Sequence, residues 1–231
     1  MNITIFCATR WEAGHILGIG AWTRSGPGAY RRDTPRGSAE LVLTGIGRKN
    51  AGRAAEAAMA GPLGRPDLAI SAGFAAALAE EALPGDLVLD AGRSDPSLLE
   101  TFAGISRRLG IPAHRGSVLS ADRVLLRAEE KKSARSETGA IAAEMEGGAI
   151  SEVCRNRGVP FCAVRTVSDS RDQDIPAAVR SLGPGGVPGG RFWLDLCARP
   201  GDWMGLWRLA ASSRKAGKNL SKILEEYLCA E

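Results

Sequence analysis

The stretch at 139–169 restricts the possible folds of this chain more than any other part of its sequence. Gly147 and Gly148 begin a helical pattern that continues to about Arg157, and residues 158–160 are typical of a turn. The apolar run 161–164 then has the length and composition of a buried strand. A strand–helix–strand unit of this kind belongs to α/β proteins, which bind ligands at the carboxyl ends of parallel strands.

Acidic residues lie at the two places where such a unit would carry a ligand site. The pair Met145–Glu146 precedes the helix, and Asp169 follows the strand. Acidic side chains are also common at helix starts, where the helix dipole favours them, and in loops. From this segment alone, Glu146 and Asp169 are candidate site residues, and the ordinary structural interpretation stays open.

The rest of the chain alternates between strand and helix patterns. Strands are predicted at 2–7, 40–44, 67–71, 85–90 and near 116–120, with one or two short strands within 20–40. Helices are predicted near 11–17, 50–60, 95–109, 122–131 and 203–229, with a turn of small residues at 73–78. This alternation predicts an α/β fold with a largely parallel sheet that is covered by helices on both faces.

The length of 231 residues fits one sizeable α/β domain. The segment 183–190 is too rich in glycine and proline to be helical, so it is predicted to be a loop. We therefore expect a main domain at 1–182, this loop, and a C-terminal helical extension at 191–231 that packs on the same domain.

Composition argues against a nucleic-acid partner. The net charge of +4 is mild for this length, and aromatic residues make up only 5% of the chain. No basic run is interleaved with aromatic residues, as a nucleic-acid platform would require. The charge permits a phosphate or an acidic surface as a partner but does not call for either.

The cysteines and histidines exclude several kinds of site. Five scattered cysteines without a CxxC pair favour buried, reduced thiols in a cytosolic protein over disulfides or a nucleophile. His15 and His114 are the only histidines and are far apart in the sequence, so a histidine-based zinc site or a Ser–His–Asp triad is not expected. The N-terminal sequence MNITIFCATR lacks the apolar core of a signal peptide, and we expect a cytoplasmic protein.

Three blocks of sequence together resemble one known superfamily. They are TGIGRKNAG at 44–52, ISAGFAAALAEEALPGDLVL at 70–89, and the two parts AAEMEGGAI and VRTVSDSRD within 142–172. In this order and spacing they are similar to the nucleoside phosphorylase and nucleosidase superfamily, in particular to methylthioadenosine/S-adenosylhomocysteine nucleosidases. The resemblance implies a three-layer α/β/α sandwich with a mixed, mostly parallel central sheet, a homodimer, a small-molecule purine nucleoside as substrate, and neither metal nor organic cofactor.

The same resemblance implies roles for individual residues. Asp169 matches the general acid that protonates the purine at N7, and Glu12 matches the residue that activates the attacking water. Glu146 matches the carboxylate that binds the ribose 2′-hydroxyl, and Met145 the apolar floor beneath the sugar. From the sequence alone, Glu12 is also an ordinary acidic residue in the first turn of a helix.

Further residues are expected to line the substrate pocket. Val124 stands where the family has an aromatic residue that stacks on the base, and Leu125 where the backbone hydrogen-bonds adenine. Valine weakens that stacking, which leaves adenine and other purines open. The remaining pocket residues implied by the resemblance are Phe74, Ala75 and Ser168.

Two positions distinguish hydrolysis from phosphorolysis. Phosphorylases of this superfamily carry an arginine and a Ser or Thr where this chain has Ser71 and Phe74, so two phosphate ligands are missing. The remaining anion candidates are Gly45–Ile46–Gly47 at a helix start, Arg10 and Arg48. We expect hydrolytic cleavage of the N-ribosidic bond of a 5′-modified purine nucleoside, favouring an adenosyl compound. Phosphorolysis, or a non-catalytic nucleoside-binding or membrane-peripheral protein, are the alternatives.

The C-terminal region resembles that of hopanoid-associated members of the family, which act on an adenosylated hopane. Apolar residues recur there at helical spacing, and basic residues occupy other faces. We favour a last helix that packs on the sheet with a solvated basic face. Weak contact with an anionic membrane surface, or a pocket lined by tryptophans for a large 5′-substituent, stay open.

Overall fold

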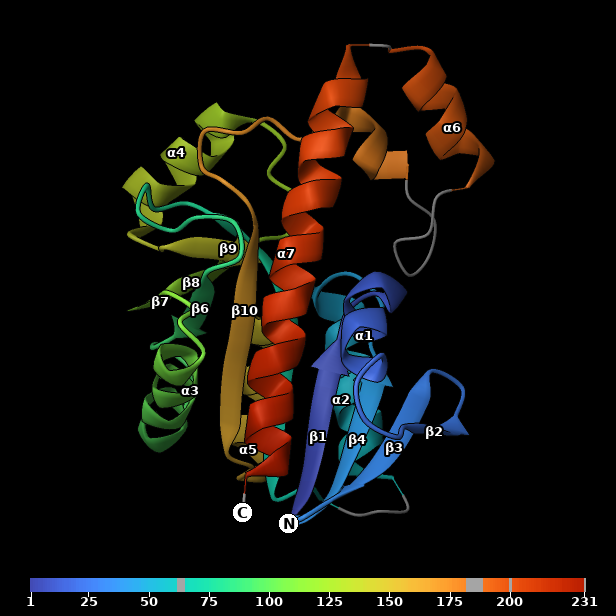
Figure 1. The fold of residues 1–231 in the computed structure, drawn as a ribbon, viewed down its shortest axis with the longest axis vertical. Helices are drawn as coiled ribbons and strands as arrows, with labels where there is room; N and C mark the ends of the chain where they lie inside the picture. Colours follow the sequence, from blue (N-terminus) through green and yellow to red (C-terminus); the bar gives the residue numbers. More distant parts are fainter. Residues whose placement is uncertain (62–64, 182–188, 200, 231) are drawn as a thin grey trace.

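A computed structural model describes residues 1–61, 65–181, 189–199 and 201–230. Its strands are β1 (Asn2–Cys7), β2 (Thr23–Gly26), β3 (Ala29–Thr34), β4 (Gly37–Leu43), β5 (Leu68–Ala77), β6 (Leu87–Asp90), β7 (Ala113–Gly116), β8 (Val118–Ser120), β9 (Ala142–Glu144) and β10 (Phe161–Asp169). Its helices are α1 (Arg10–Leu17), α2 (Arg48–Met59), α3 (Pro96–Arg108), α4 (Ala128–Thr138), α5 (Gly147–Arg157), α6 (Gly190–Cys197) and α7 (Asp202–Cys229), with a short 3₁₀ helix at Ala177–Ser181. Figure 1 shows helices on both faces of one sheet.

The sheet has the order β2-β3-β4-β1-β5-β10-β6-β7, and β9 joins β5 to the short strand β8. The neighbours β4, β1, β5 and β10 run parallel, so their carboxyl ends lie on one edge of the sheet. β6 pairs antiparallel with β10, and β3 pairs antiparallel with β2 and β4. The expected α/β class with a mixed sheet is confirmed.

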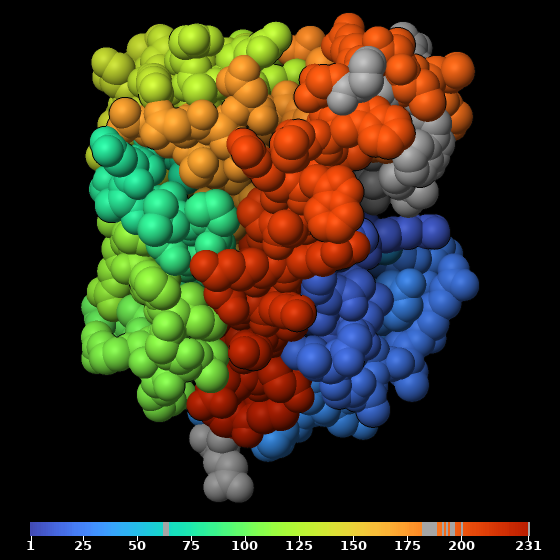
Figure 2. All heavy atoms as spheres, turned by 45° about the horizontal axis from the view of Figure 1, so that its top comes forward, coloured from blue at the N-terminus to red at the C-terminus, as the bar shows by residue number. Residues whose placement is uncertain are grey.

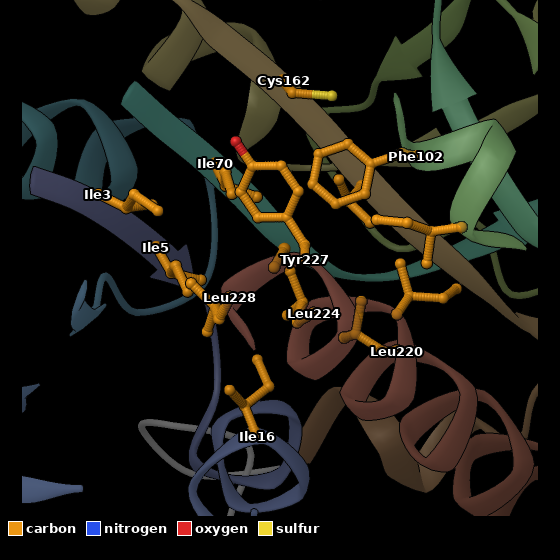
Figure 3. Close-up of a cluster of buried hydrophobic side chains, with 14 of the residues drawn as sticks. Ile3, Ile5, Ile16, Ile70, Phe102, Cys162, Leu220, Leu224, Tyr227 and Leu228 are labelled. Atoms are coloured by element: carbon orange, nitrogen blue, oxygen red, sulfur yellow. The ribbon is translucent and has the colours of Figure 1, made fainter. Parts of the chain in front are cut away.

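Two apolar layers hold the helices to the sheet. On one face α1, α3 and α7 cover residues of β1, β5 and β10, and the rings of Phe102 and Tyr227 stack with their centroids 4.7 Å apart (Figure 3). On the other face, small residues such as Ala51 and Ala55 of α2 and Ala149 of α5 pack against the sheet. Close packing of these small residues lets both helices approach each other and the strands.

Helix α7 changes character along its length. From Ala216 onward its apolar residues are buried against β10, α1 and α3. Near its start, Trp203 is 55% exposed, Met204 68% and Trp207 75%. Figure 2 shows this first part of α7 on the surface of the molecule, beside α6. In the described part of the chain no helix is both long and apolar enough to cross a bilayer.

Two sequence expectations about local structure are wrong. Residues 73–78 do not form a turn, because Gly73 and Ala76 continue β5 and pair with Arg165 and Asp169 of β10. Pairing with strands on both sides thus outweighs the low strand propensity of glycine and alanine. The helix predicted at 122–131 begins only at Ala128 and runs to Thr138. Its start is fixed by the Glu130 carboxylate, which accepts hydrogen bonds from the N–H groups of Leu126 and Arg127.

Other differences are additions. Helix α6 was not predicted as a separate helix, and the strand expected near 116–120 is divided into β7 and β8. The first strand of the predicted strand–helix–strand unit is the short strand β9. Most of the glycine- and proline-rich segment predicted as a loop at 183–190 lies outside the described residues. The tail helix predicted at 203–229 is present as α7.

Candidate active site

A cavity of about 660 Å³ opens at the edge of the sheet where the parallel strands end. Residues that follow β1 and residues at the carboxyl ends of β5 and β10 converge there, together with β9 and the segments next to β9 and α4. All nine residues to which the family resemblance gives a place in the site line this one cavity: Glu12, Phe74, Ala75, Val124, Leu125, Met145, Glu146, Ser168 and Asp169. The fold thus brings together positions up to 157 residues apart in the chain (169 minus 12).

Glu12 is held at the start of α1 by hydrogen bonds to both of its carboxylate oxygens. Thr9 caps the helix, and its N–H and hydroxyl groups each donate to Glu12 Oε2 at 2.9 Å. The backbone N–H of Phe74 donates to Glu12 Oε1 at 2.8 Å. Glu12 is therefore the helix-start acid that its position predicts, and its buried carboxylate also faces the cavity.

Glu146 lies at the N-cap of α5, and its Oε1 accepts a hydrogen bond from the backbone N–H of Gly47 at 2.7 Å. Gly47 has φ of 92°, a conformation that a side chain would strain. Burial raises the pKa of Glu146 to about 7; the Arg165 guanidinium opposes this rise and the Glu12 carboxylate adds to it. The cavity therefore holds a carboxyl group that titrates near neutral pH.

A buried ion pair beneath the cavity was missed by the sequence analysis. Arg165 Nη2 lies 2.7 Å from Glu144 Oε2 and 2.8 Å from Ser71 Oγ. Burial alone would raise the pKa of Glu144, but Arg165, Ser120 and two backbone N–H groups together hold it below its ordinary value. An arginine inside the apolar strand 161–167 needs a carboxylate partner, and this signal could have identified the pair.

Gly73 permits the close approach of Glu12 and Arg165. A Cβ atom at this position would lie 2.6 Å from Glu12 Oε1 and 2.9 Å from Arg165 Nη1. Both distances are shorter than van der Waals contact, so a larger residue would displace one of these groups. The glycine in the 70–89 block is therefore explained by the geometry of the site rather than by a turn.

Asp169 ends β10, where the pairing with β5 shifts register after Val167. Its Oδ1 lies 2.7 Å from the hydroxyl of Ser168, and its Oδ2 lies 2.5 Å from Lys131 Nζ. Lys131 comes from α4, is fully buried, and was also missed by the sequence analysis. A buried lysine is a departure from the usual solvent exposure of this residue and requires a partner.

One end of the cavity is mostly apolar, and we call it the apolar end. This name covers the lining residues from the segment after β10 and from α6 and α7, which are Ile175, Val179, Phe192, Leu206, Leu209 and Ala210, with Ser213 and Arg214 as the polar members. Val124, where the resemblance implies an aromatic residue in the family, lines the cavity and is 37% exposed.

The predicted anion candidates are not brought together. Arg10 and Arg48 are exposed and do not line the cavity, whereas Ile46 does. The backbone N–H of Gly47 already donates to Glu146, and that of Phe74 donates to Glu12. Both donors are therefore occupied by carboxylates instead of being available to an anion.

The thiols take no part in this site. Cys7, Cys154 and Cys162 are buried and unpaired, as expected. Burial raises the pKa of Cys154 and of Cys162 to about 12, so neither is a thiolate at neutral pH. Among the described residues, no cluster of three or more His, Cys, Asp or Glu side chains is placed to hold a metal ion.

Comparison of sequences identifies relatives. The model of the Phosphorylase superfamily matches residues 90–182. A 5′-methylthioadenosine/S-adenosylhomocysteine nucleosidase of Halalkalibacterium halodurans is 36% identical over 78 residues, which are 32% of this chain and 33% of the relative. The match thus spans about a third of the length of this curated relative.

Comparison of structures extends the likeness to nearly the whole chain. The crystal structure of Helicobacter pylori 5′-methylthioadenosine/S-adenosyl homocysteine nucleosidase has a TM-score of 0.74 at 18% identity, with 98% of this chain and 97% of that chain covered. Futalosine hydrolase of Helicobacter pylori has a TM-score of 0.71 at 19% identity, with 98% of each chain covered. Residues 90–182 therefore match the Phosphorylase superfamily, and the chain as a whole has the fold of these nucleosidases.

Proposed function

We propose that this protein is a hydrolase that cleaves the N-ribosidic bond of a 5′-modified purine nucleoside, favouring an adenosyl compound, and releases the free base. The observation that carries the proposal is the convergence of Glu12, Glu146 and Asp169 in one cavity. The names of the relatives support the reaction class, since methylthioadenosine/S-adenosylhomocysteine nucleosidases appear among both the sequence and the structure matches.

Departure of the base requires an acid. A purine is a poor leaving group until its ring is neutralised, and a proton from Asp169 to N7 would achieve this as the bond from C1′ to N9 breaks. A positioned general acid contributes roughly 10²- to 10⁴-fold in rate. Asp169 lines the same cavity as Val124 and Leu125, which would contact the base.

Attack of water on the sugar requires a general base that accepts a proton, and a negative charge that stabilises the sugar in the transition state. Water would add its oxygen to C1′ and give its proton to Glu12, which is oriented by Thr9 and Phe74. Glu146 would accept a hydrogen bond from the 2′-hydroxyl, with Met145 beneath the sugar. Carboxylates beside the ring also stabilise the positive charge that develops on the sugar, as in glycosidases.

Phosphorolysis is the alternative reaction, with ribose 1-phosphate as product. Two observations favour water. The backbone N–H groups of Gly47 and Phe74 donate to carboxylates, and Glu12 and Glu146 would repel a phosphate dianion. Phe74 also occupies the position of the phosphate-binding hydroxyl of phosphorylases.

We propose that the 5′-substituent is apolar and large. The lining of the cavity also includes Phe192, Leu206 and Leu209 from α6 and α7, and we assign this region to the 5′-substituent. Apolar walls of this kind gain free energy by removing apolar surface from water, at about 25 cal/mol per Å².

The partners are also proposals. We propose a homodimer and a cytoplasmic location, and the three buried unpaired thiols suit a reducing compartment. The exposed side chains of Trp203, Met204 and Trp207 make the start of α7 the candidate for weak contact with a membrane surface. Sedimentation of the pure protein, with and without anionic lipid vesicles, tests the dimer and the membrane contact.

One assay tests the function. The protein is incubated with methylthioadenosine, S-adenosylhomocysteine, inosine or an adenosyl compound with a long alkyl 5′-group, with and without phosphate, and free base is measured. We expect base release without phosphate, fastest with the alkyl compound. Ribose 1-phosphate as the product would establish phosphorolysis. No base from any compound would establish a non-catalytic binding protein.

A further inference from the structure

Lys131 is a buried cation that the proposed chemistry has not yet used. Its side chain has no exposed surface, although it belongs to α4, whose neighbouring residues are mostly solvent-facing. Its Nζ lies 2.5 Å from Asp169 Oδ2, 2.9 Å from the carbonyl oxygen of Ser170 and 2.8 Å from that of Gln173. Three acceptors match the three N–H donors of an ammonium group, so the geometry is that of a charged lysine.

This contact determines which oxygen of Asp169 can carry a proton. Because Oδ2 accepts a hydrogen bond from Lys131, the proton of a neutral Asp169 belongs on Oδ1. The Ser168 hydroxyl lies 2.7 Å from Oδ1 and 3.3 Å from the carbonyl oxygen of Ala75. It can donate to Ala75 while Oδ1 is protonated, and to Oδ1 once that proton has left.

We propose that Lys131 is a positioning residue for the general acid: it directs the acidic proton of Asp169 to Oδ1 and stabilises the carboxylate left when that proton moves to N7. In this step the bond from C1′ to N9 breaks, the proton passes from Oδ1 to N7, and Lys131 keeps all three of its protons. The inference rests on the proposed role of Asp169 as the acid.

The surrounding charges support this specific role. Asp172 and Asp174 lie in the segment after Asp169, but each has a surface partner of its own, Lys132 at 2.6 Å and Arg127 at 2.9 Å. Among the described residues, Lys131 is the cation in contact with Asp169. Lys132, adjacent in sequence, faces solvent and provides a matched control.

The test must separate an effect on the acid from a general loss of structure. A nucleoside needs N7 protonation, whereas 4-nitrophenyl β-D-ribofuranoside releases a stable phenolate without an acid. We expect Lys131→Met to lower kcat for the nucleoside by about 10²-fold, the size of effect that misplacing a reacting group by about 1 Å produces. We expect less than about threefold loss with the nitrophenyl riboside, because that step needs no acid.

Two control variants distinguish a failure of this inference from a failure of the proposed function. Lys132→Met should leave both rates unchanged, and Asp169→Asn should show the same selective loss as Lys131→Met. Equal loss of both activities in Lys131→Met, or no loss of either, would overturn the inference. If Asp169→Asn keeps its nucleosidase rate, the proposed function of Asp169 fails instead.

A double variant covers the case in which Lys131→Met does not fold because the buried Asp169 Oδ2 is left without its hydrogen-bond donor. Lys131→Met combined with Asp169→Asn removes both charges. If Lys131 acts only through Asp169, the double variant should have the same kcat as Asp169→Asn within about twofold, since residues that act as a unit are not additive. A further tenfold loss would show that Lys131 acts elsewhere and would contradict the proposal.

Discussion

The two ends of the cavity are built by different parts of the chain and from different side chains. At one end, Glu12, Glu146 and Asp169 are fixed by hydrogen bonds from backbone N–H groups, a hydroxyl and a buried lysine. At the other end, α6 and α7 supply apolar walls. Directional contacts at the first end suit a fixed reaction geometry, whereas apolar contacts at the second select by size and surface. We therefore expect that mutations can change the proposed chemistry and the proposed substrate choice separately.

The largest effect is expected at the polar end. Asp169→Asn keeps the size of the side chain but removes the acidic proton, so kcat for an adenosyl nucleoside should fall by roughly 10²- to 10⁴-fold. Asp172→Asn, on an exposed neighbour that pairs with Lys132, is the matched control and should change kcat less than twofold. Steady-state release of free base measures both, and similar rates for the two variants would contradict the role of Asp169.

The buried ion pair between Arg165 and Glu144 should contribute strongly to the stability of the fold. Arg165→Met leaves the buried carboxylate of Glu144 without its partner, so the free energy of unfolding should fall by about 3–5 kcal/mol. Arg157→Met removes an exposed ion pair with Glu56 and should cost less than about 1 kcal/mol. Urea denaturation of both variants measures the two losses in the free energy of unfolding. Equal losses would contradict the claim that the buried ion pair matters more to stability than the exposed one.

The contribution of Glu146 to the stability of the fold should depend on pH. Its pKa is about 7 in the fold and near 4.5 in the unfolded chain, so the folded state binds the extra proton between these values. The resulting stability is fully present below pH 4.5 and is lost as the pH rises through 7. Glu146→Gln, which does not titrate, should therefore gain stability relative to the wild type with rising pH, by on the order of 2–3 kcal/mol at pH 8.

Thermal or urea unfolding at pH 5 and pH 8 provides the measurement for Glu146. Glu152→Gln, at an exposed position of the same helix, is the control and should show the same difference from the wild type at both pH values. A constant difference for Glu146→Gln as well would show that the buried carboxyl does not titrate between 4.5 and 7.

The smallest effect is expected at the apolar end. Leu206→Ala shortens a wall of the cavity, so kcat/KM for an adenosyl compound with a long alkyl 5′-group should fall by about tenfold, with little change for methylthioadenosine. Leu194→Ala, at a leucine of α6 that is 72% exposed, should change neither. Equal losses for both substrates in Leu206→Ala would mean that this wall does not contact the 5′-group.

The sequence predicted the polar end better than the apolar end. Strand β1, helix α1 and the strand–helix–strand unit at 139–169 have local signals, and the motif residues that follow them lie in one cavity as a consequence of the parallel sheet. Their roles stay predictions. An arginine inside an apolar strand signals that Arg165 has a buried carboxylate partner, but the sequence does not identify that partner as Glu144, 21 residues away. The pair Lys131–Asp169 has no such signal, because its members are 38 residues apart and only the fold brings them together.

The local errors have a related cause. The small residues at 73–78 look like a turn because glycine and alanine have low strand propensity, but pairing on both sides of β5 keeps them extended. The start of α4 depends on one side chain, Glu130, that caps two backbone N–H groups. The apolar wall depends on how α6 and α7 fold back over the cavity, and helical spacing alone does not indicate the direction in which a helix packs.

The identity of the nucleophile is the most direct test of the proposed hydrolysis. The protein is incubated with an adenosyl nucleoside in phosphate-free buffer made with ¹⁸O-labelled water, and the sugar product is examined by mass spectrometry. We predict that free base is released and that one ¹⁸O atom is found on C1′ of the sugar. Base release that requires added phosphate, with a sugar 1-phosphate as the product and no label on C1′, would contradict the assignment of Glu12 as the residue that activates water.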